Sequence, residues 1–138
     1  MKRRRHQHVL VGVDVPSIGD AEQPFRKFGD HHLTRLYTDH EREICREGAH
    51  DAASSLAARF AAKETVDKLL DASNEGPSWC SIEIYRAQSD RPELVPRRRA
   101  TEIARRRGVE DISRSLAHDG YVAAATGVAR ASLGKRSR

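Results

Sequence analysis

The segment from Asp51 to Asp71 constrains the fold most strongly, because it contains neither glycine nor proline and is rich in alanine. Leu56, Phe60 and Leu69 recur in it at spacings that suit one buried face of a helix. We therefore expect a long helix here, with the rest of the chain packed around it.

This helix also carries charges that a plain core helix would lack. Arg59 and Lys63 lie one turn apart, as do Glu64 and Lys68, so the members of each pair share a face. Most such pairs are intrahelical salt bridges at the surface. The alternative is a functional site on the helix, and that alternative depends on motifs elsewhere in the chain.

The first predicted strand ends in a carboxylate. Residues His8 to Val15 form a run rich in β-branched side chains, which Pro16 ends, and Asp14 lies at the end of this run. A carboxylate in that place either caps the next turn or binds a hard cation. Mg²⁺ prefers one or two protein carboxylates together with phosphate oxygens, which makes Asp14 a candidate metal ligand.

The remaining segments complete an α+β domain, because strands and helices alternate along the chain. Thr38 and Glu41 form a capping box, which marks the start of one helix. A predicted turn from Ala117 to Gly120 contains His118, which is either an ordinary turn residue or a donor to a phosphate oxygen. The expected helices are 18–28, interrupted by Pro24, then 38–48, 51–71 and 96–108, and the expected strands are 8–15, 79–86, 93–95, 111–116 and 121–129.

The net charge of +5 arises at the two ends of the chain. Residues 1–7 and 131–138 hold seven of the 25 basic residues and no acidic residue. We therefore expect one domain at 8–130 and two basic tails, 1–7 and 131–138. A folded nucleic-acid surface also needs aromatic side chains among its basic ones, and the aromatic content of 5% argues against such a partner.

Composition and cysteine use favour a small cytoplasmic protein. A chain of 138 residues with 38% hydrophobic and 33% charged content should form one domain with a lean core, which oligomerisation would supplement. No apolar run is long enough to cross a membrane, and the N-terminus lacks a signal-peptide pattern. Cys45 and Cys80 have no metal-binding spacing and are expected as free thiols in a reducing cytosol.

Three separated motifs follow one another along the chain. Gly12 to Asp14 looks like a GxD motif, Phe60 to Lys68 looks like (F/W)xxKE(S/A)xxK, and Ser115 to His118 resembles S-x-S/T-H. In this order the set resembles the 4'-phosphopantetheinyl transferase superfamily, and the short chain resembles its single-domain class, the holo-acyl-carrier-protein synthases. Weaker similarities to that class are at 36–41 (FTxxE), 79–84 (W-x-DIE) and 91–92 (G-x-P).

The resemblance covers about Val9 to Ala129 and implies both a fold and an activity. The fold would be a single domain in which a small antiparallel sheet packs against a long central helix. The activity would be Mg²⁺-dependent transfer of the phosphopantetheine group of coenzyme A to a serine of an acidic apo carrier protein. Adenosine 3',5'-bisphosphate would be released.

The resemblance also assigns roles to individual residues. Asp14 and Glu64 would bind the metal, Glu64 would accept the proton of the serine, and Lys68 would act at the leaving group. The residues that would contact coenzyme A are Arg59, Lys63, Lys68 and His118. Small members of the family resemble homotrimers with active sites between protomers, and their basic docking residues lie largely on the first helix, where this chain has Arg26 and Lys27, with Arg35 nearby.

Three positions depart from the family pattern. Ala117 replaces a hydroxyl residue, Asp71 stands where a glycine follows the motif lysine, and Arg91 replaces the glycine before Pro92. Two other interpretations therefore stay open, a catalytically silent relative that binds coenzyme A or a carrier protein, and a small basic nucleic-acid-binding protein.

Overall fold

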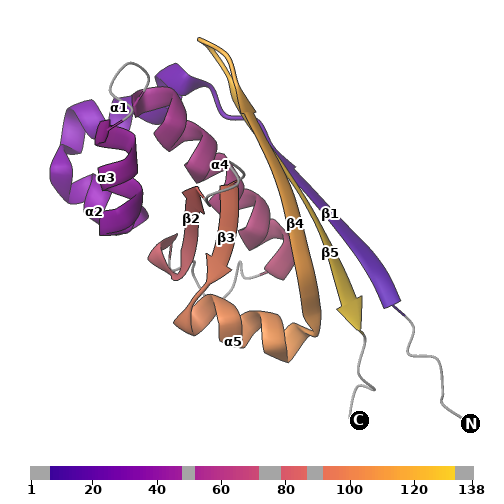
Figure 1. Cartoon of the computed structure of the whole chain (residues 1–138). Coiled ribbons are helices and arrows are strands. Elements are labelled where there is room, and N and C mark those ends of the chain that lie inside the picture. Colours follow the sequence, from indigo (N-terminus) through magenta and orange to yellow (C-terminus); the bar gives the residue numbers. More distant parts are fainter. Residues whose placement is uncertain (1–6, 48–51, 72–78, 87–91, 133–138) are drawn as a thin grey trace, which may run out of the picture.

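The computed structural model describes residues 7–47, 52–71, 79–86 and 92–132 and confirms the α+β class (Figure 1). The strands are β1 (Gln7–Asp14), β2 (Ile82–Arg86), β3 (Pro92–Pro96), β4 (Val109–His118) and β5 (Ala123–Ser132). The helices of the described residues are α1 (Ile18–Phe28), α2 (Asp30–Leu36), α3 (Asp39–Glu47), α4 (Ala52–Leu70) and α5 (Arg98–Arg107), together with the 3-10 turn η1 (Trp79–Ser81).

Two antiparallel sheets flank helix α4. Strands β1, β5 and β4 form one sheet in that order, while β2 and β3 form a separate pair. Gln7 is opposite Ser132 and Asp14 is opposite Ala125, so β1 and β5 pair along the whole of β1. Figure 1 shows α4 lying against the three-stranded sheet, with β2 and β3 on its other side.

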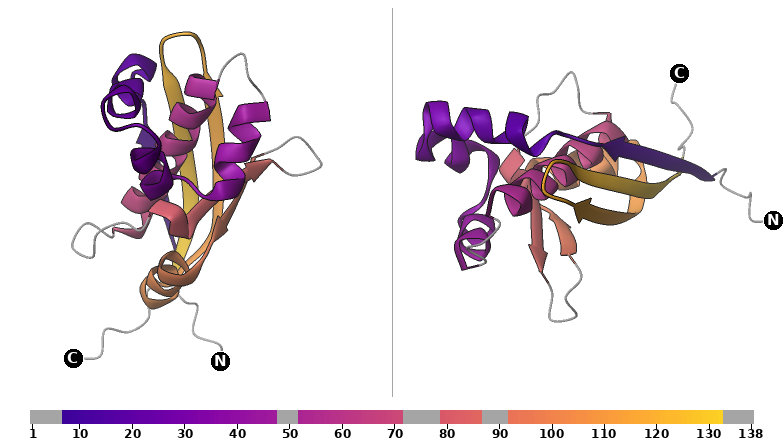
Figure 2. Two further views of the ribbon diagram at one scale, coloured as in Figure 1. Left: turned by 90° about the vertical axis from the view of Figure 1, so that its left-hand side faces the viewer. Right: turned by 90° about the horizontal axis from the view of Figure 1, so that it is seen from above.

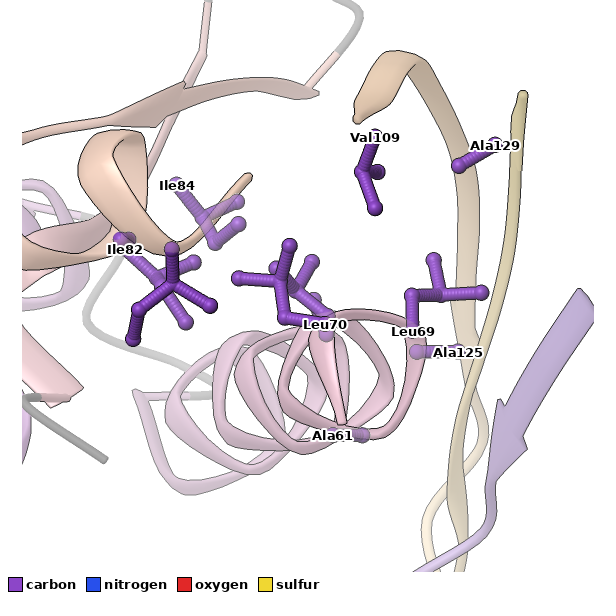
Figure 3. Close-up of a cluster of buried hydrophobic side chains, with 12 residues drawn as sticks. Ala61, Leu69, Leu70, Ile82, Ile84, Val109, Ala125 and Ala129 are labelled. Carbon is purple, nitrogen blue, oxygen red and sulfur yellow. The ribbon is translucent and has the colours of Figure 1, made fainter. Parts of the chain in front are cut away.

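The main hydrophobic core follows from this arrangement. Leu69 and Leu70 at the end of α4 are buried between the two sheets (Figure 3). The other buried members of this cluster that Figure 3 labels are Ala61, Ile82, Ile84, Val109, Ala125 and Ala129. Much of the sheet side of this core consists of alanine, which lets the helix lie close to the strands.

Two glycines bring α4 closer still. A methyl group added at Gly127 of β5 would lie 2.8 Å from Thr65 Cγ2 and 2.9 Å from Leu69 Cδ1. One added at Gly12 of β1 would lie 3.2 Å from the carbonyl oxygen of Thr65. Glycine in a strand permits such a close approach, so these positions set the distance between α4 and the end of β1.

Helix α3 begins as the sequence predicts, and α2 is an element that the sequence does not predict. The Thr38 N–H donates to Glu41 Oε1 at 3.0 Å, and the Glu41 N–H donates to Thr38 Oγ1 at 3.2 Å, which confirms the capping box. Helix α2 has only seven residues, too few to be stable alone. The chain is anchored directly after it, because the Tyr37 ring is buried and its hydroxyl donates to the Leu56 carbonyl at 2.8 Å.

Other boundaries differ from the sequence-based expectation. Helix α1 continues through Pro24. His118 ends β4 instead of lying in the turn, because the turn is made by the next residue, Asp119, whose Oδ1 accepts from the N–H groups of Tyr121 and Val122. The pairing of β1 with β5 begins at Gln7 opposite Ser132, and the domain bounds 8–130 stay a prediction.

On the outer face of the three-stranded sheet, an apolar stripe along β1 is not covered by any described element. Val9, Val11 and Val13 alternate with the residues that face α4, and 67%, 72% and 53% of their surfaces are exposed. Val128 of β5 is exposed on the same face, opposite Val11. Figures 1 and 2 show that the described helices gather on the other side of the sheet.

Some of the sequence-based predictions concern residues that the structure does not describe. The structure does not describe residues 1–6 and 133–138 of the tails, the side chain of Cys45 or the departure at Arg91. Cys80 is a free thiol, as expected. Within the described ranges, no helix is both long enough and apolar enough to span a membrane.

Candidate active site

Asp14, Glu64 and Lys68 meet where β1 ends beside α4. Asp14 is opposite Ala125, which is buried against α4, and directly opposed residues of antiparallel strands point to the same face. The Lys68 amine donates to Asp14 Oδ1 at 3.1 Å and to the Val13 carbonyl at 3.0 Å. Glu64 precedes Lys68 by one turn, so two carboxylates and one ammonium group converge here.

The acidity of Glu64 reflects this crowding of negative charge. Burial and, next, the neighbouring carboxylate of Asp14 raise the pKa of Glu64 to about 7, while the charge of Lys68 acts in the opposite direction. Asp14 Oδ2 is buried and has no hydrogen-bond partner among the described residues. Both observations describe a pair of carboxylates whose charge the protein itself only partly compensates.

Asp14 and Glu64 are the residues that would hold a divalent cation at this place, since their charge is only partly compensated and Asp14 Oδ2 has no hydrogen bond among the described residues. In the part of the chain that the structure describes, no third histidine, cysteine, aspartate or glutamate joins them as a potential ligand. Mg²⁺ tolerates such a site, because it takes few protein carboxylates and completes its shell with water and phosphate oxygens. More than half of the Lys68 side chain is exposed, so its amine is accessible to a phosphate group at the same place.

Lys63 lies in the core rather than at this site. Its side chain is completely buried, and its amine donates to Glu41 Oε1 at 2.6 Å and to the carbonyls of Trp79 at 2.9 Å and Ile82 at 2.7 Å. An ammonium group has three donors, and all three are used. No donor of Lys63 is therefore left for a phosphate oxygen in this structure, and the predicted contact with coenzyme A would require one of these three hydrogen bonds to break.

The ion pair of Lys63 and Glu41 instead fixes α4 in place. Burial lowers the pKa of Lys63, and the charge of Glu41 opposes this shift. Glu41 also accepts from the Thr38 N–H and, at 3.3 Å, from the Ile84 N–H. One pair thus ties α4 to α3, η1 and β2. The sequence predicts only the capping role of Glu41, although a lysine that follows two alanines in a core helix is a signal for a buried partner.

Arg59 and His118 are not brought to the carboxylates within one chain. Arg59 is 8% exposed and donates to Ser55 Oγ at 2.5 Å, one turn back along α4. His118 lies opposite Ala123 at the end of β4. Because β5 separates β4 from β1, His118 and Asp14 lie on the two outer strands of the sheet, near the same end.

The two described departures from the family pattern have distinct environments. Asp71 follows α4 with φ of 50°, a left-handed conformation that favours glycine and that aspartate tolerates better than most residues. Its carboxylate lies 3.4 Å from Arg107 of α5. Ala117 is exposed on β4 beside His118, so the missing hydroxyl leaves the core unaffected.

Comparison with known proteins gives one family. Residues 10–126 match the 4'-phosphopantetheinyl transferase superfamily. The holo-[acyl-carrier-protein] synthase of Moorella thermoacetica is 37% identical over 123 residues, which are 89% of this chain and 94% of that protein.

Solved structures agree with this result. The holo-[acyl-carrier-protein] synthase of Helicobacter pylori in complex with coenzyme A is 27% identical and superposes with a TM-score of 0.72, covering 87% of this chain and 99% of that one. An ACPS–CoA complex from Chronobacterium ammoniagenes is 25% identical with a TM-score of 0.78, covering 91% and 99% of the two chains.

The buried ion pair makes a prediction about stability. Lys63→Met should lower the free energy of unfolding by about 3–5 kcal/mol, because it leaves the Glu41 carboxylate buried without a cation. Adding Glu41→Gln should recover part of this loss, since the amide keeps an oxygen for the Thr38 N–H but carries no charge. Urea denaturation of both single variants and of the double variant measures the coupling.

Lys68→Met serves as the control, since it makes the same chemical change on the same helix at an exposed amine. It should cost less than about 1 kcal/mol. Additive losses in the double variant would contradict the ion-pair account.

Proposed function

The chain belongs to the 4'-phosphopantetheinyl transferase superfamily, and from its holo-[acyl-carrier-protein] synthase relatives we propose that it transfers the phosphopantetheine group of coenzyme A to a serine of an apo carrier protein. We also infer that the reaction depends on Mg²⁺ and releases adenosine 3',5'-bisphosphate. The observation that supports this proposal best is the meeting of Asp14, Glu64 and Lys68, with one buried carboxylate oxygen left without a hydrogen bond.

In this reaction the protein has to stabilise negative charge and does not need to form a covalent intermediate. The serine hydroxyl attacks the phosphorus that carries the pantetheine arm, the bond to the bridging oxygen breaks, and negative charge grows on phosphate oxygens. A bound Mg²⁺ would neutralise part of that charge. Asp14 and Glu64 are the residues that would hold it.

Two side chains would transfer protons in this reaction, one at the serine and one at the leaving nucleotide. Glu64 accepts the proton of the serine hydroxyl, a role that suits a carboxylate whose pKa is raised toward neutrality. Lys68 leaves its contact with Asp14 and donates to the oxygen of the departing nucleotide. Its exposed amine on a fixed helix needs only a side-chain rotation to do so.

Arg59 and His118 would bind other phosphate oxygens of coenzyme A from a neighbouring protomer. Within one chain β5 lies between the strands of His118 and Asp14, so a site that uses both residues fits best between two copies. The uncovered face with Val9, Val11 and Val13 offers an apolar surface for such assembly. We therefore extend the proposal to a homotrimer with shared active sites, and cytoplasmic location remains a prediction of the sequence.

A second candidate function is that of a catalytically silent relative. Asp71 favours it, because its carboxylate at the end of α4 would repel a phosphate group bound near Lys68. Nucleic-acid binding has the weaker case, since the sequence contains few aromatic residues.

Intact-mass spectrometry tests the activity. An acidic apo carrier protein incubated with this protein, coenzyme A and Mg²⁺ should gain the mass of one phosphopantetheine. Glu64→Ala should slow the gain by at least about 100-fold, because it removes both a metal ligand and the base. A chelator should have a similar effect, whereas Asp67→Asn, a change to another carboxylate on α4, should leave the rate close to that of the wild type.

Two results would count against parts of this account. Coenzyme A binding without transfer to any of several carrier proteins would favour the silent relative. Full activity in the presence of chelator would remove Mg²⁺ from the mechanism.

Assembly is tested by sedimentation and activity together. The wild type should sediment at the mass of three 15.5 kDa chains, and Val11→Asp should dissociate it, because the change places a charge on the apolar sheet face. Transfer should fall with the dissociation, since His118 of the neighbour is lost. Thr101→Asp, which adds the same charge at an exposed position of α5, away from this sheet face, should leave the sedimentation unchanged. A monomeric wild type with full activity would refute the shared site.

A further inference from the structure

The start of helix α1 lies close to the candidate active site. Three residues, Val15 to Ser17, separate Asp14 at the end of β1 from Ile18 at the start of α1. Four steps along an extended chain cover at most about 14 Å. Even a domain of about 50 residues has a radius of gyration of about 10 Å. A carrier protein whose serine reaches Asp14 and Glu64 would therefore also cover the first turn of α1.

The first turn of α1 is held against the turn that joins β4 to β5. The Ile18 N–H donates to the Tyr121 carbonyl at 2.9 Å, and an isolated antiparallel bridge joins Ser17 to Val122. The start of the helix and this turn therefore present one continuous surface beside the end of β1. Its members are residues 17–20 and 119–122, and we call them the entrance surface.

A hollow of about 540 Å³ opens in the entrance surface and extends to the N-terminal turn of α4. Ile18 and Val122 give it apolar walls, while Ser17 and Ser54 give it polar ones. The Tyr121 side chain also lines the hollow and is 83% exposed. An exposed aromatic ring beside a hollow of mixed polarity is typical of a surface that contacts another protein.

Both charges of the entrance surface are negative. Asp20 is exposed, and its backbone N–H donates to Ser17 Oγ at 3.2 Å. Asp119 is exposed as well, and hydrogen bonds from the N–H groups of Tyr121 and Val122 lower the pKa of its carboxylate. Within the described parts of the chain, neither carboxylate takes part in an ion pair. An acidic side chain of a partner would therefore meet like charge here.

Neighbouring segments do not reverse this local charge. Residues 14–25 contain three acidic residues and no basic one. Arg59, the one basic residue in the first half of α4, is 8% exposed and bonds within its own helix. His118 and Lys68 are assigned to coenzyme A in the proposed function, so phosphate groups would compensate their charges. The entrance surface is thus locally acidic in a chain whose net charge is +5.

We propose that Asp20 is a specificity-determining residue, which selects a carrier protein with a basic side chain next to its modifiable serine and disfavours one with a carboxylate there. This inference rests on the proposed transferase function. A carrier protein that is acidic overall satisfies it, as long as the charge beside its serine is positive. Asp20 acts on recognition of the partner and has no role in the chemical step.

Steady-state kinetics with two versions of one apo carrier protein test the assignment. The versions differ in one residue next to the serine, which is glutamate in one and lysine in the other. The wild type should have a KM at least about tenfold lower for the lysine version, and Asp20→Lys should reverse this order. The kcat at saturating carrier protein and KM for coenzyme A should stay within about twofold, and the difference between the versions should shrink at high salt.

Glu102→Lys is the matched control, because it makes the same change of charge at an exposed position of α5, far from α1 (Figure 1). It should keep the wild-type order of the two KM values. The same order in the wild type and Asp20→Lys, a reversal in the control, or a change confined to kcat would overturn the role of Asp20 while transfer itself continues. No transfer by the wild type to either version would instead refute the proposed function, and this assignment with it.

Discussion

The buried ion pair of Lys63 and Glu41 is the interaction on which the rest of the structure depends. An ammonium group in the core is unfavourable unless every donor is paired, and here one carboxylate and two carbonyls pair all three. Successive helix residues turn by roughly 100°. Holding Lys63 against β2 therefore turns Glu64 toward β1, so a contact outside the candidate site sets the direction of its central carboxylate.

Strand β1 supplies the second constraint and links the site to the rest of the molecule. Gly12 lets α4 lie close to the strand, and two residues later Asp14 meets Glu64 and Lys68. The alternating residues Val11 and Val13 point to the uncovered side of the sheet. One strand thus carries part of the candidate metal site on one face and the proposed assembly surface on the other, which explains why Leu10, Gly12 and Asp14 alternate with valines along it.

The sequence predicts which residues meet at the candidate site better than it predicts which residues hold them there. Ordered motifs identify Asp14, Glu64 and Lys68, and the structure brings these three together. The same motif suggests a phosphate contact for Lys63, because a motif specifies residue types without the direction in which each side chain points. Helix α2 is not predicted because tertiary contacts stabilise it. The placement of Gln7 and Ser132 beside Gly108 depends on the β1–β5 register, which no local pattern reveals.

Calorimetric titration of coenzyme A tests the central claim, that Asp14 and Glu64 hold Mg²⁺ against the phosphates of coenzyme A. The titration would use the wild type and Asp14→Asn, each with and without Mg²⁺, after circular dichroism has verified the fold of the variant. We predict that Mg²⁺ strengthens binding to the wild type at least about tenfold, a coupling that should vanish in the variant. An equal effect of Mg²⁺ on both proteins would contradict the account, because the cation would then act without this carboxylate.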